Sequence, residues 1–200
     1  MIYRSRELTY MKIETQRLII RKLRLSDWPD IVEGVGDLEV SKWTTNIPHP
    51  YSRADAELFI KNTIKNWGKT SYSFCLELRS EKKVIGMMSL ESILNTNGTG
   101  VTGSWINKKY WRQGFITEAK IAVNEFAFNT LKLRRLNSSA MVGNKASNAT
   151  QLKVGYVHEG MQRKGCRSKA TGKVHNLNMY GLLKEDWKIA RKKLTKNKER

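Results

Sequence analysis

The chain has 200 residues, with 37 Lys and Arg against 18 Asp and Glu and a formal net charge of +19. This length suits one α/β domain, and a hydrophobic content of 40% excludes a disordered chain. The positive charge attracts anions such as phosphorylated cofactors, acidic proteins or nucleic acid, and it argues against a polyamine substrate; a solvated basic surface is the alternative.

Residue usage also bears on the setting of the protein. Cys75 and Cys166 form no C-x-x-C unit, and His49, His158 and His175 have no metal-ligand spacing, so we expect neither a metal site nor a disulfide framework. The N-terminus lacks the apolar segment of a secretory signal, and the apolar runs are far shorter than the ~20 residues of a membrane span. We therefore expect a protein of the reducing cytoplasm without membrane association.

No internal repeat and no linker rich in Gly, Pro or Ser divides the chain. Because Met11 precedes the first organised segment, we expect residues 1–10 to form an N-terminal extension. Residues 11–187 then form a single domain, and residues 188–200 a basic C-terminal tail.

The first predicted elements are a strand and two helices. The alternation in RLIIRKLRL (17–25) predicts a strand, and Ser26 is a suitable N-cap for a short helix over residues 26–37. Ser52 is the expected cap of a second helix over residues 53–67, in which apolar residues recur at helical spacing.

Three strands and a long helix follow. Residues 71–78, 83–93 and 101–106 have strand character, and turn-forming segments separate them. The clearest helical pattern covers residues 115–131, where apolar residues recur on one face and Lys120 and Asn124 are expected at solvent positions.

The rest of the chain alternates between strands and helices. It contains a predicted strand over residues 134–142, a helix over 144–153, a strand around 156–159 and a long strand over 174–183. The tail from Lys184 is expected to be helical and exposed. This order predicts a mixed α/β (α+β) fold, with a largely antiparallel first half and a β-α-β unit in the second half.

The stretch YWRQGFITEA (110–119) stands between a predicted strand and the long helix. A helix N-terminus has unpaired N–H groups and about half a positive charge, so it binds phosphate. Gly114 lets the backbone approach an anion closely, Arg112 adds a cation and Thr117 adds a hydroxyl. The spacing is neither G-x-x-x-x-G-K-[ST] nor G-x-G-x-x-G. Alone, the turn therefore leaves two interpretations open, a phosphate site and an ordinary helix cap.

Five segments, in the right order, resemble the GCN5-related N-acetyltransferases (GNAT), specifically the RimJ/RimL type that acetylates protein N-termini and other amines. These segments are ETQRLIIRKLRLSDWPDI, KVIGMMSL, GSWINKKYWRQGFITEA, NKASNATQLKVGYVHEGMQR and HNLNMYGLLKEDW, and they span Glu14 to Trp187. The resemblance implies the GNAT acyl-CoA N-acyltransferase fold, whose central, mostly antiparallel sheet splays at the coenzyme A (CoA) site and is flanked by helices.

The resemblance also implies acetyl-CoA as cosubstrate and assigns its contacts. Backbone amides of the turn would wrap the pyrophosphate, and those of the preceding strand would pair with the pantetheine arm like an added strand. At Ile116 the family usually has a smaller residue. The implied CoA contacts are Trp105, Ile106, Asn107, Arg112, Gln113, Gly114, Phe115, Ile116, Thr117, Asn144 and Ser147.

Acetyl transfer to an amine needs a neutral amine, a stabilised oxyanion and a proton for the leaving thiolate. Ser147 is our candidate donor of that proton, and a helix N-cap is its alternative role. A glutamate that some family members carry aligns with Cys166, so Glu91 is the substitute candidate for the general base; an ordinary solvent-facing strand residue is the alternative. Glu118 and Glu159 are interpreted as structural.

The amine acceptor would enter between the N-terminal helices and the far strands, where Trp43, Pro48, His49 and Tyr51 are candidates to line the opening. The expected acceptor is a protein N-terminus of the ribosomal-protein type, which attacks the thioester directly. A small amine, an aminoglycoside-like antibiotic and a lysine side chain are alternatives. The charge favours an acidic partner.

A further alternative is a basic, nucleic-acid- or ribosome-associated binding protein that has a GNAT fold and no catalysis. Against it, the sequence contains no zinc-finger pattern, no RNP-type run and no clear helix-turn-helix. Related proteins are monomers or homodimers, so either state is expected here.

Overall fold

One eight-stranded sheet organises the residues that the computed structural model describes, 11–93 and 96–196. The strand order is β1-β2-β3-β4-β5-β6-β8-β7, and every neighbouring pair is antiparallel except β5 and β6. The expected extension over residues 1–10, and residues 197–200 of the expected tail, lie outside the described residues. The strands are β1 (Lys12–Glu14), β2 (Leu18–Lys22), β3 (Ser71–Leu78), β4 (Lys83–Glu91), β5 (Thr99–Ile106), β6 (Arg135–Met141), β7 (Val157–Arg167) and β8 (Val174–Leu183).

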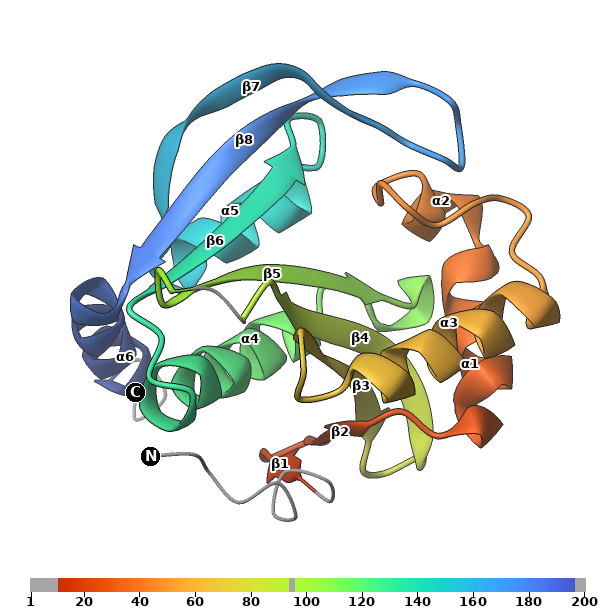
Figure 1. Ribbon diagram of the computed structural model, residues 1–200, viewed down its shortest axis with the longest axis horizontal. Helices are drawn as coiled ribbons and strands as arrows, with labels where there is room; N and C mark the ends of the chain where they lie inside the picture. Colours follow the sequence, from red (N-terminus) through yellow and green to blue (C-terminus); the bar gives the residue numbers. More distant parts are fainter. Residues whose placement is uncertain (1–10, 94–95, 197–200) are drawn as a thin grey trace.

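Helices cover both faces of this sheet (Figure 1). One face carries α1 (Trp28–Gly36), α2 (Leu38–Ser41) and α3 (Arg53–Asn66), with the short helix η1 (Leu25–Asp27) before α1. The other face carries α4 (Phe115–Glu125), α5 (Lys145–Lys153) and α6 (Lys184–Lys196). The short helix η2 (Lys108–Tyr110) precedes α4, and η3 (Phe126–Thr130) continues it as a π-helix.

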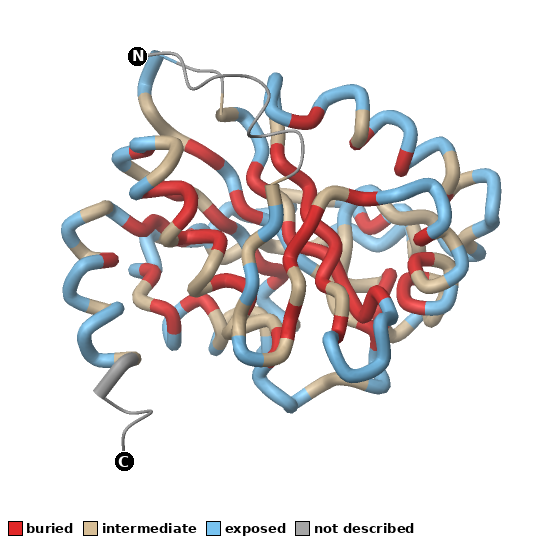
Figure 2. The backbone as a smooth tube through the Cα atoms, turned by 90° about the horizontal axis from the view of Figure 1, so that it is seen from below, coloured by how far each residue is buried: buried red, intermediate tan, exposed pale blue. Residues whose placement is uncertain are grey.

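Two apolar clusters hold these layers together. The larger lies between the sheet and α4 and includes Phe74, Phe126 and Leu136; the smaller lies under α1 and α3 and includes Ile31 and Met87. Figure 2 shows the buried residues gathered along the strands in the middle of the molecule. Burial of such side chains is the main favourable term in folding.

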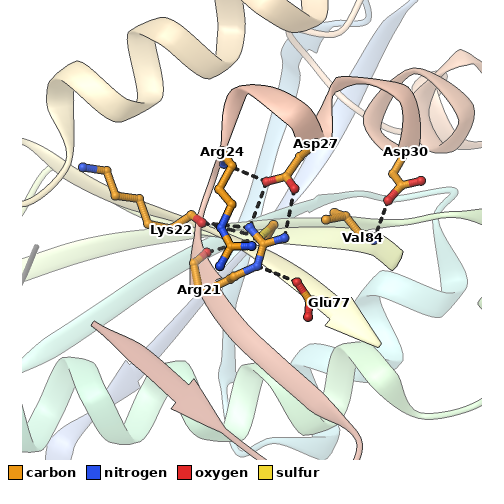
Figure 3. Close-up of polar contacts among 8 residues, drawn as sticks. Arg21, Lys22, Arg24, Asp27, Asp30, Glu77 and Val84 are labelled. Atoms are coloured by element: carbon orange, nitrogen blue, oxygen red, sulfur yellow. Dashed lines mark hydrogen bonds and ion pairs between the residues drawn. The ribbon is translucent and has the colours of Figure 1, made fainter. Parts of the chain in front are cut away.

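A buried ionic cluster fixes α1 to the sheet (Figure 3). The Arg21 guanidinium on β2 donates to both carboxylate oxygens of Asp27, each at 2.9 Å, and to Oε2 of Glu77 at 2.6 Å. Asp30 on α1 accepts the backbone N–H of Val84 at 2.8 Å. Because Arg21 and Asp27 are buried, their mutual pairing is what makes these charges tolerable in the interior.

The sheet splays between its two parallel strands. β5 pairs with β6 only from Thr99 to Thr102, and the last pair is Thr102 with Ser138. Beyond that pair, β5 stays bonded to β4 as far as Ile106, and β6 stays bonded to β8 as far as Met141. The gap between them opens toward the N-terminus of α4, as the family resemblance implied.

Most of the predicted elements are confirmed. The strands over residues 71–78 and 174–183 have the predicted bounds, and Ser52 caps α3 by a capping box with Asp55. Three predictions need correction. Ser26 does not cap the first helix, because it lies inside η1, and Asp27 is the N-cap of α1. The strand around 156–159 is only the start of β7, which continues to Arg167, and the helical tail is not fully exposed, because Trp187 packs into the larger core with 2% of its surface exposed. Within the described ranges, none of the helices combines the length and the apolar character that crossing a bilayer requires.

Candidate active site

The turn before α4 presents bare backbone. Gly114 is the N-cap of α4 with φ 81°, and no side chain caps the first turn of the helix. Arg112, two residues earlier, has φ 61°, a left-handed conformation that is uncommon for a residue with a Cβ. The N–H groups of the first helical turn therefore face outward without a side-chain acceptor, which is the arrangement that binds phosphate.

Arg17, in the loop between β1 and β2, braces this turn by binding Glu118 in the first turn of α4. The Glu118 carboxylate accepts from the Arg17 Nη2 and Nε, both at 2.7 Å, from the Arg17 backbone N–H at 2.9 Å and from Thr15 Oγ1 at 2.6 Å. Arg17 also donates to the Gln113 carbonyl at 2.9 Å and lies 4.2 Å above the Phe115 ring. Burial alone would raise the pKa of Glu118, but these hydrogen bonds and the Arg17 charge outweigh it and hold the pKa below its ordinary value.

A groove of about 730 Å³ adjoins the turn. It runs along α4 past Gly114, Thr117 and Ile121 and reaches Leu152 at the end of α5. α6 forms its outer wall, and the cations Arg17, Lys153 and Lys193 are among its lining residues. Apolar walls, cations and free N–H groups together fit a nucleotide with several phosphates, as acetyl-CoA is.

The edge of β5 offers two amides to the gap. The Asn107 backbone N–H donates to the Ile85 carbonyl at 2.8 Å, so it points toward β4. Because backbone groups alternate in direction along a strand, the N–H of Trp105 also points toward β4, whereas those of Ser104 and Ile106 point into the gap. The amides of Trp105 and Asn107, which the resemblance assigned to pantetheine, thus point toward β4, whereas the amide of Ser104, absent from the predicted set, points into the gap.

Glu91 and Ser147 lie on opposite faces of the sheet. Glu91 is exposed at the end of β4, opposite Val101, on the face that carries α1 and α3. Ser147 is half-buried in the first turn of α5, on the other face. A base at Glu91 would therefore act on the side where an amine enters, and an acid at Ser147 on the side where CoA enters.

The N-cap of α5 is Asn144, not Ser147. The Asn144 side chain accepts the backbone N–H of Ser147 at 3.1 Å. Asn148 ties α5 to β6 and β8, because its side chain accepts from Tyr180 at 2.6 Å and from Asn178 at 2.7 Å and donates to the Met141 carbonyl at 3.0 Å. No sequence motif pointed to Asn148.

On the face of the sheet that carries α1 and α3, the segment after α2 borders the gap. The ring of Trp43 lies against Gly143 at the end of β6, and His49 is exposed close to Asp37. Tyr51 packs against the smaller core cluster, and this burial raises its pKa to about 12. Pro48 is half-buried in the same loop. Among the predicted acceptor residues, Trp43 thus contacts the chain at the end of β6.

Glu159 and the two cysteines have structural surroundings. Glu159 forms an ion pair with Arg135, and Cys75 is buried against the Arg21 carbonyl at 3.4 Å. Cys166 faces His175 across the β7–β8 pair. No group of three or more His, Cys, Asp or Glu side chains in residues 11–93 and 96–196 is placed to hold a metal ion.

A buried lysine, Lys120, was missed entirely. The sequence analysis placed it at a solvent position on the long helix, but its side chain is 1% exposed and donates to Thr102 Oγ1 at 3.3 Å. Burial lowers its pKa to about 7. The spacing Lys120–Asn124, one turn apart on one face, was the available signal that this face carries buried polar groups.

Comparisons with known proteins agree with this geometry. The family model described as "Acetyltransferase (GNAT) domain" matches residues 17–157. A protein of Bacillus subtilis (strain 168) named "Putative ribosomal N-acetyltransferase YdaF" is 28% identical over 178 residues, covering 86% of this chain and 94% of the relative. The acetyltransferase (GNAT family) structure from Bacillus anthracis is 26% identical with a TM-score of 0.76, covering 88% of this chain and 99% of that one. Mycobacterium smegmatis RimJ, solved in complex with CoA-disulfide, shares the fold with a TM-score of 0.75 at 14% identity, covering 84% and 83% of the two chains.

Proposed function

The chain belongs to the GNAT acetyltransferase family and is an acetyl-CoA-dependent acyltransferase; on this premise, we propose that it acetylates the α-amino group of a protein whose N-terminal segment is acidic. The observation that supports this acceptor is a cluster of cations at the tip of the β7–β8 hairpin. The cluster lies beside the acceptor side of the gap, which is the face of the sheet that carries α1 and α3. The relative from Bacillus subtilis, named for ribosomal N-acetylation, supports a protein acceptor.

In the proposed complex, acetyl-CoA supplies an activated acetyl thioester, and the chain binds it by its phosphates. Backbone N–H groups from Gln113 to Thr117 and the cation of Arg112 hold the pyrophosphate. Phe115 contributes only its backbone, because its ring is buried below Arg17. Trp105 contributes through its ring, which packs against Gly34 of α1 and supports the strand from behind.

The protein groups around the gap then divide the chemistry. The Ser104 N–H, which points into the gap, stabilises the developing oxyanion, an effect worth about 3 kcal/mol for one such donor. Glu91 accepts the proton of the amine, directly or through water, and Ser147 donates a proton to the departing thiolate. An α-amine with a pKa of about 7.7–8.0 is partly neutral at pH 7, so it needs only a weak base.

The hairpin between β7 and β8 supports an acidic acceptor. Residues 160–183 contain five Lys or Arg and no Asp or Glu. The tip of the hairpin arches toward α2 (Figure 1), and the Lys169 backbone N–H donates to the Thr45 carbonyl at 3.1 Å. Its cations are therefore held beside the acceptor side, where they attract negative charge. These exposed cations are Arg163, Lys164, Arg167, Lys169 and Lys173.

A turnover assay with acetyl-CoA, read as free CoA, tests this proposal. The acceptors are three peptides with the same first residue, followed by acidic, neutral or basic residues, together with a polyamine and an aminoglycoside. We expect the lowest KM for the acidic peptide, and a loss of that preference in Lys164→Glu/Lys169→Glu. The matched control, Lys188→Glu/Lys192→Glu, changes the same charge on α6 and should keep the preference. Equal turnover of all three peptides, or turnover of the small amines alone, would refute the acidic N-terminus.

A further inference from the structure

Thr102 and Ser138 form the last residue pair between β5 and β6 before the strands part. This pair is held by side-chain hydroxyl groups as well as by the backbone. Thr102 Oγ1 donates to the Asn137 carbonyl at 3.4 Å, and Ser138 Oγ donates to the Thr102 carbonyl at 3.1 Å. Each hydroxyl thus crosses to the backbone of the opposite strand. Both residues are 3% exposed, so water does not compete strongly for these bonds.

This residue pair lies where strand pairing would otherwise weaken. The parallel pairing of β5 and β6 covers only four residues on each strand, and parallel pairs are slightly less stable per residue than antiparallel ones. At the point where the strands part, carbonyl groups lose their ladder partners, and a buried carbonyl needs another donor. At this boundary the two hydroxyls add donors to the carbonyls of Asn137 and Thr102.

Side chains from both flanking helices reach the two hydroxyls. Lys120 of α4 donates to Thr102 Oγ1 at 3.3 Å, and Gln151 Nε2 of α5 donates to Ser138 Oγ at 2.8 Å. The Tyr156 hydroxyl lies 3.2 Å from Thr102 Oγ1 and donates to Asn124 Oδ1 at 3.3 Å. The Thr102–Ser138 pair is therefore connected to α5, which carries Ser147, and to α4. The turn at the N-terminus of α4, residues 112–117, is called the phosphate turn below.

This arrangement is not what stability alone would favour. In the described part of the chain, Asn124 Nδ2 and Gln151 Oε1 are buried without a hydrogen-bond partner, and Lys120 has no carboxylate beside it. Buried polar groups of this kind cost stability, and their persistence calls for another reason.

We infer that Thr102 and Ser138 are positioning residues, a hydroxyl clamp that fixes where β5 and β6 part and so where the thioester end of a bound pantetheine arm stops. The gap is open at Ile106, beside the phosphate turn, and closed at Thr102. These two ends are four residues apart on β5, which is about 13 Å at ~3.3 Å per residue. With the phosphates held at the open end, the far end of the arm lies nearest the clamp. The thioester would then face the Ser104 amide at a fixed depth. The kinetic consequence rests on the proposed function, whereas the clamp itself does not.

Amide hydrogen exchange of the protein without CoA tests the clamp directly. Thr102→Val removes the hydroxyl at nearly constant volume, and Ser138→Ala removes the other one; Thr102→Ser keeps the hydroxyl and serves as the matched control. We expect exchange in residues 99–102 and 135–138 to accelerate about tenfold or more in Thr102→Val and Ser138→Ala, with the wild-type pattern in Thr102→Ser. Unchanged exchange in both Thr102→Val and Ser138→Ala would overturn the clamp, as would equal acceleration in Thr102→Ser.

Kinetics then test what the clamp does. We expect kcat for acetyl transfer to fall about tenfold or more in Thr102→Val, while the Kd for CoA changes less than about twofold, because the phosphate turn is intact. Thr102→Ser should retain most of the wild-type kcat. A fall in CoA affinity that accounts for the whole loss would overturn the positioning role. A wild-type protein that does not turn over acetyl-CoA would refute the proposed function and leave the exchange result standing.

Discussion

Arg17 and Glu118, 101 residues apart in the chain, join the loop after β1 to the first turn of α4 through an ion pair at 2.7 Å. The same Arg17 side chain donates to the Gln113 carbonyl, one residue before Gly114. The phosphate turn is therefore held from outside by a residue that contributes nothing to its sequence pattern. The resemblance to GNAT enzymes located the turn, but it did not indicate what keeps the turn in shape.

Replacement of Glu118 by Ala should loosen the turn. The carboxylate accepts three hydrogen bonds, forms an ion pair with Arg17 and is mostly buried, whereas Arg17 is 40% exposed at its side chain, so we expect a loss of about 1–3 kcal/mol in the free energy of unfolding. Acetyl-CoA should also bind about tenfold more weakly, which is ~1.4 kcal/mol. Chemical denaturation and calorimetry measure the two effects.

Glu125→Ala is the control for this variant. Glu125 lies at the other end of α4, where it accepts from Trp187 Nε1 at 3.0 Å and pairs with Arg191 at 2.9 Å. Its loss should lower stability without changing the affinity for acetyl-CoA. Equal weakening in both variants would mean that general destabilisation, rather than the brace on the turn, accounts for the change.

Ser147→Ala should lower kcat by about 10²-fold or more and leave KM for acetyl-CoA nearly unchanged, because the lost hydroxyl acts on the departing thiolate while the phosphate-binding turn stays intact. Stability should also be retained, since the bond to the Asn144 side chain uses the main-chain N–H of residue 147. Steady-state kinetics measure kcat and KM for this variant. Thr150→Ala, a substitution on the same helix, is the control. Turnover at the wild-type rate would remove Ser147 from the chemistry.

Ser104→Pro should remove the oxyanion donor without breaking the sheet. The N–H of residue 104 points into the gap, so proline deletes no bond to β4. We expect kcat to fall about 10²–10³-fold, and Ser104→Ala, which keeps the N–H, to behave like the wild type. Circular dichroism verifies the fold. If the proline variant folds and turns over normally, the oxyanion donor lies elsewhere.

Lys120 should make stability rise with pH. Burial lowers its pKa in the folded protein to about 7 from an ordinary 10.5, so between these values the unfolded chain holds a proton that the folded protein has released. The free energy of unfolding then increases by up to about 1.4 kcal/mol per pH unit across this window, and below it Lys120 adds no pH dependence because it is protonated in both states.

Urea denaturation of the wild type and Lys120→Met at several pH values from 7.5 to 9.5 isolates this contribution, because the other titrating groups are common to both proteins. We expect the stability difference to shift in favour of the wild type as the pH rises. Parallel curves would show that Lys120 remains charged in the folded protein.

The periodic parts of the fold could be predicted from the sequence, and the contacts that build the site could not. Strand alternation gave β3 and β8 their bounds, and Ser52 with Asp55 marked the start of α3, because these signals are local. The direction of each amide along β5 depends on its pairing with β4, which only the register reveals. This is why Asn107 was assigned to the gap and Ser104 was overlooked.

Polar contacts between residues far apart in the chain could not be predicted from the sequence either. The sequence assigned no role to Arg17 or Asn148 and placed Lys120 in solvent, and each of the three has a hydrogen-bond partner more than 15 residues away. Lys120 in particular lies on the face that carries Ala119 and Val123, so helical periodicity would bury it, and its charge was the reason for placing it in solvent. Tertiary packing decided these positions.

The central claim is that exposed N–H groups at the start of α4 hold the pyrophosphate of acetyl-CoA, and isothermal titration calorimetry of acetyl-CoA tests it most directly. Gly114→Asp places a carboxylate at the proposed anion site, and Gly172→Asp places the same group at another glycine with positive φ, on the hairpin. We predict that Gly114→Asp weakens binding by at least about tenfold, or ~1.4 kcal/mol, while Gly172→Asp binds like the wild type. Equal affinity in wild type and Gly114→Asp would contradict the claim.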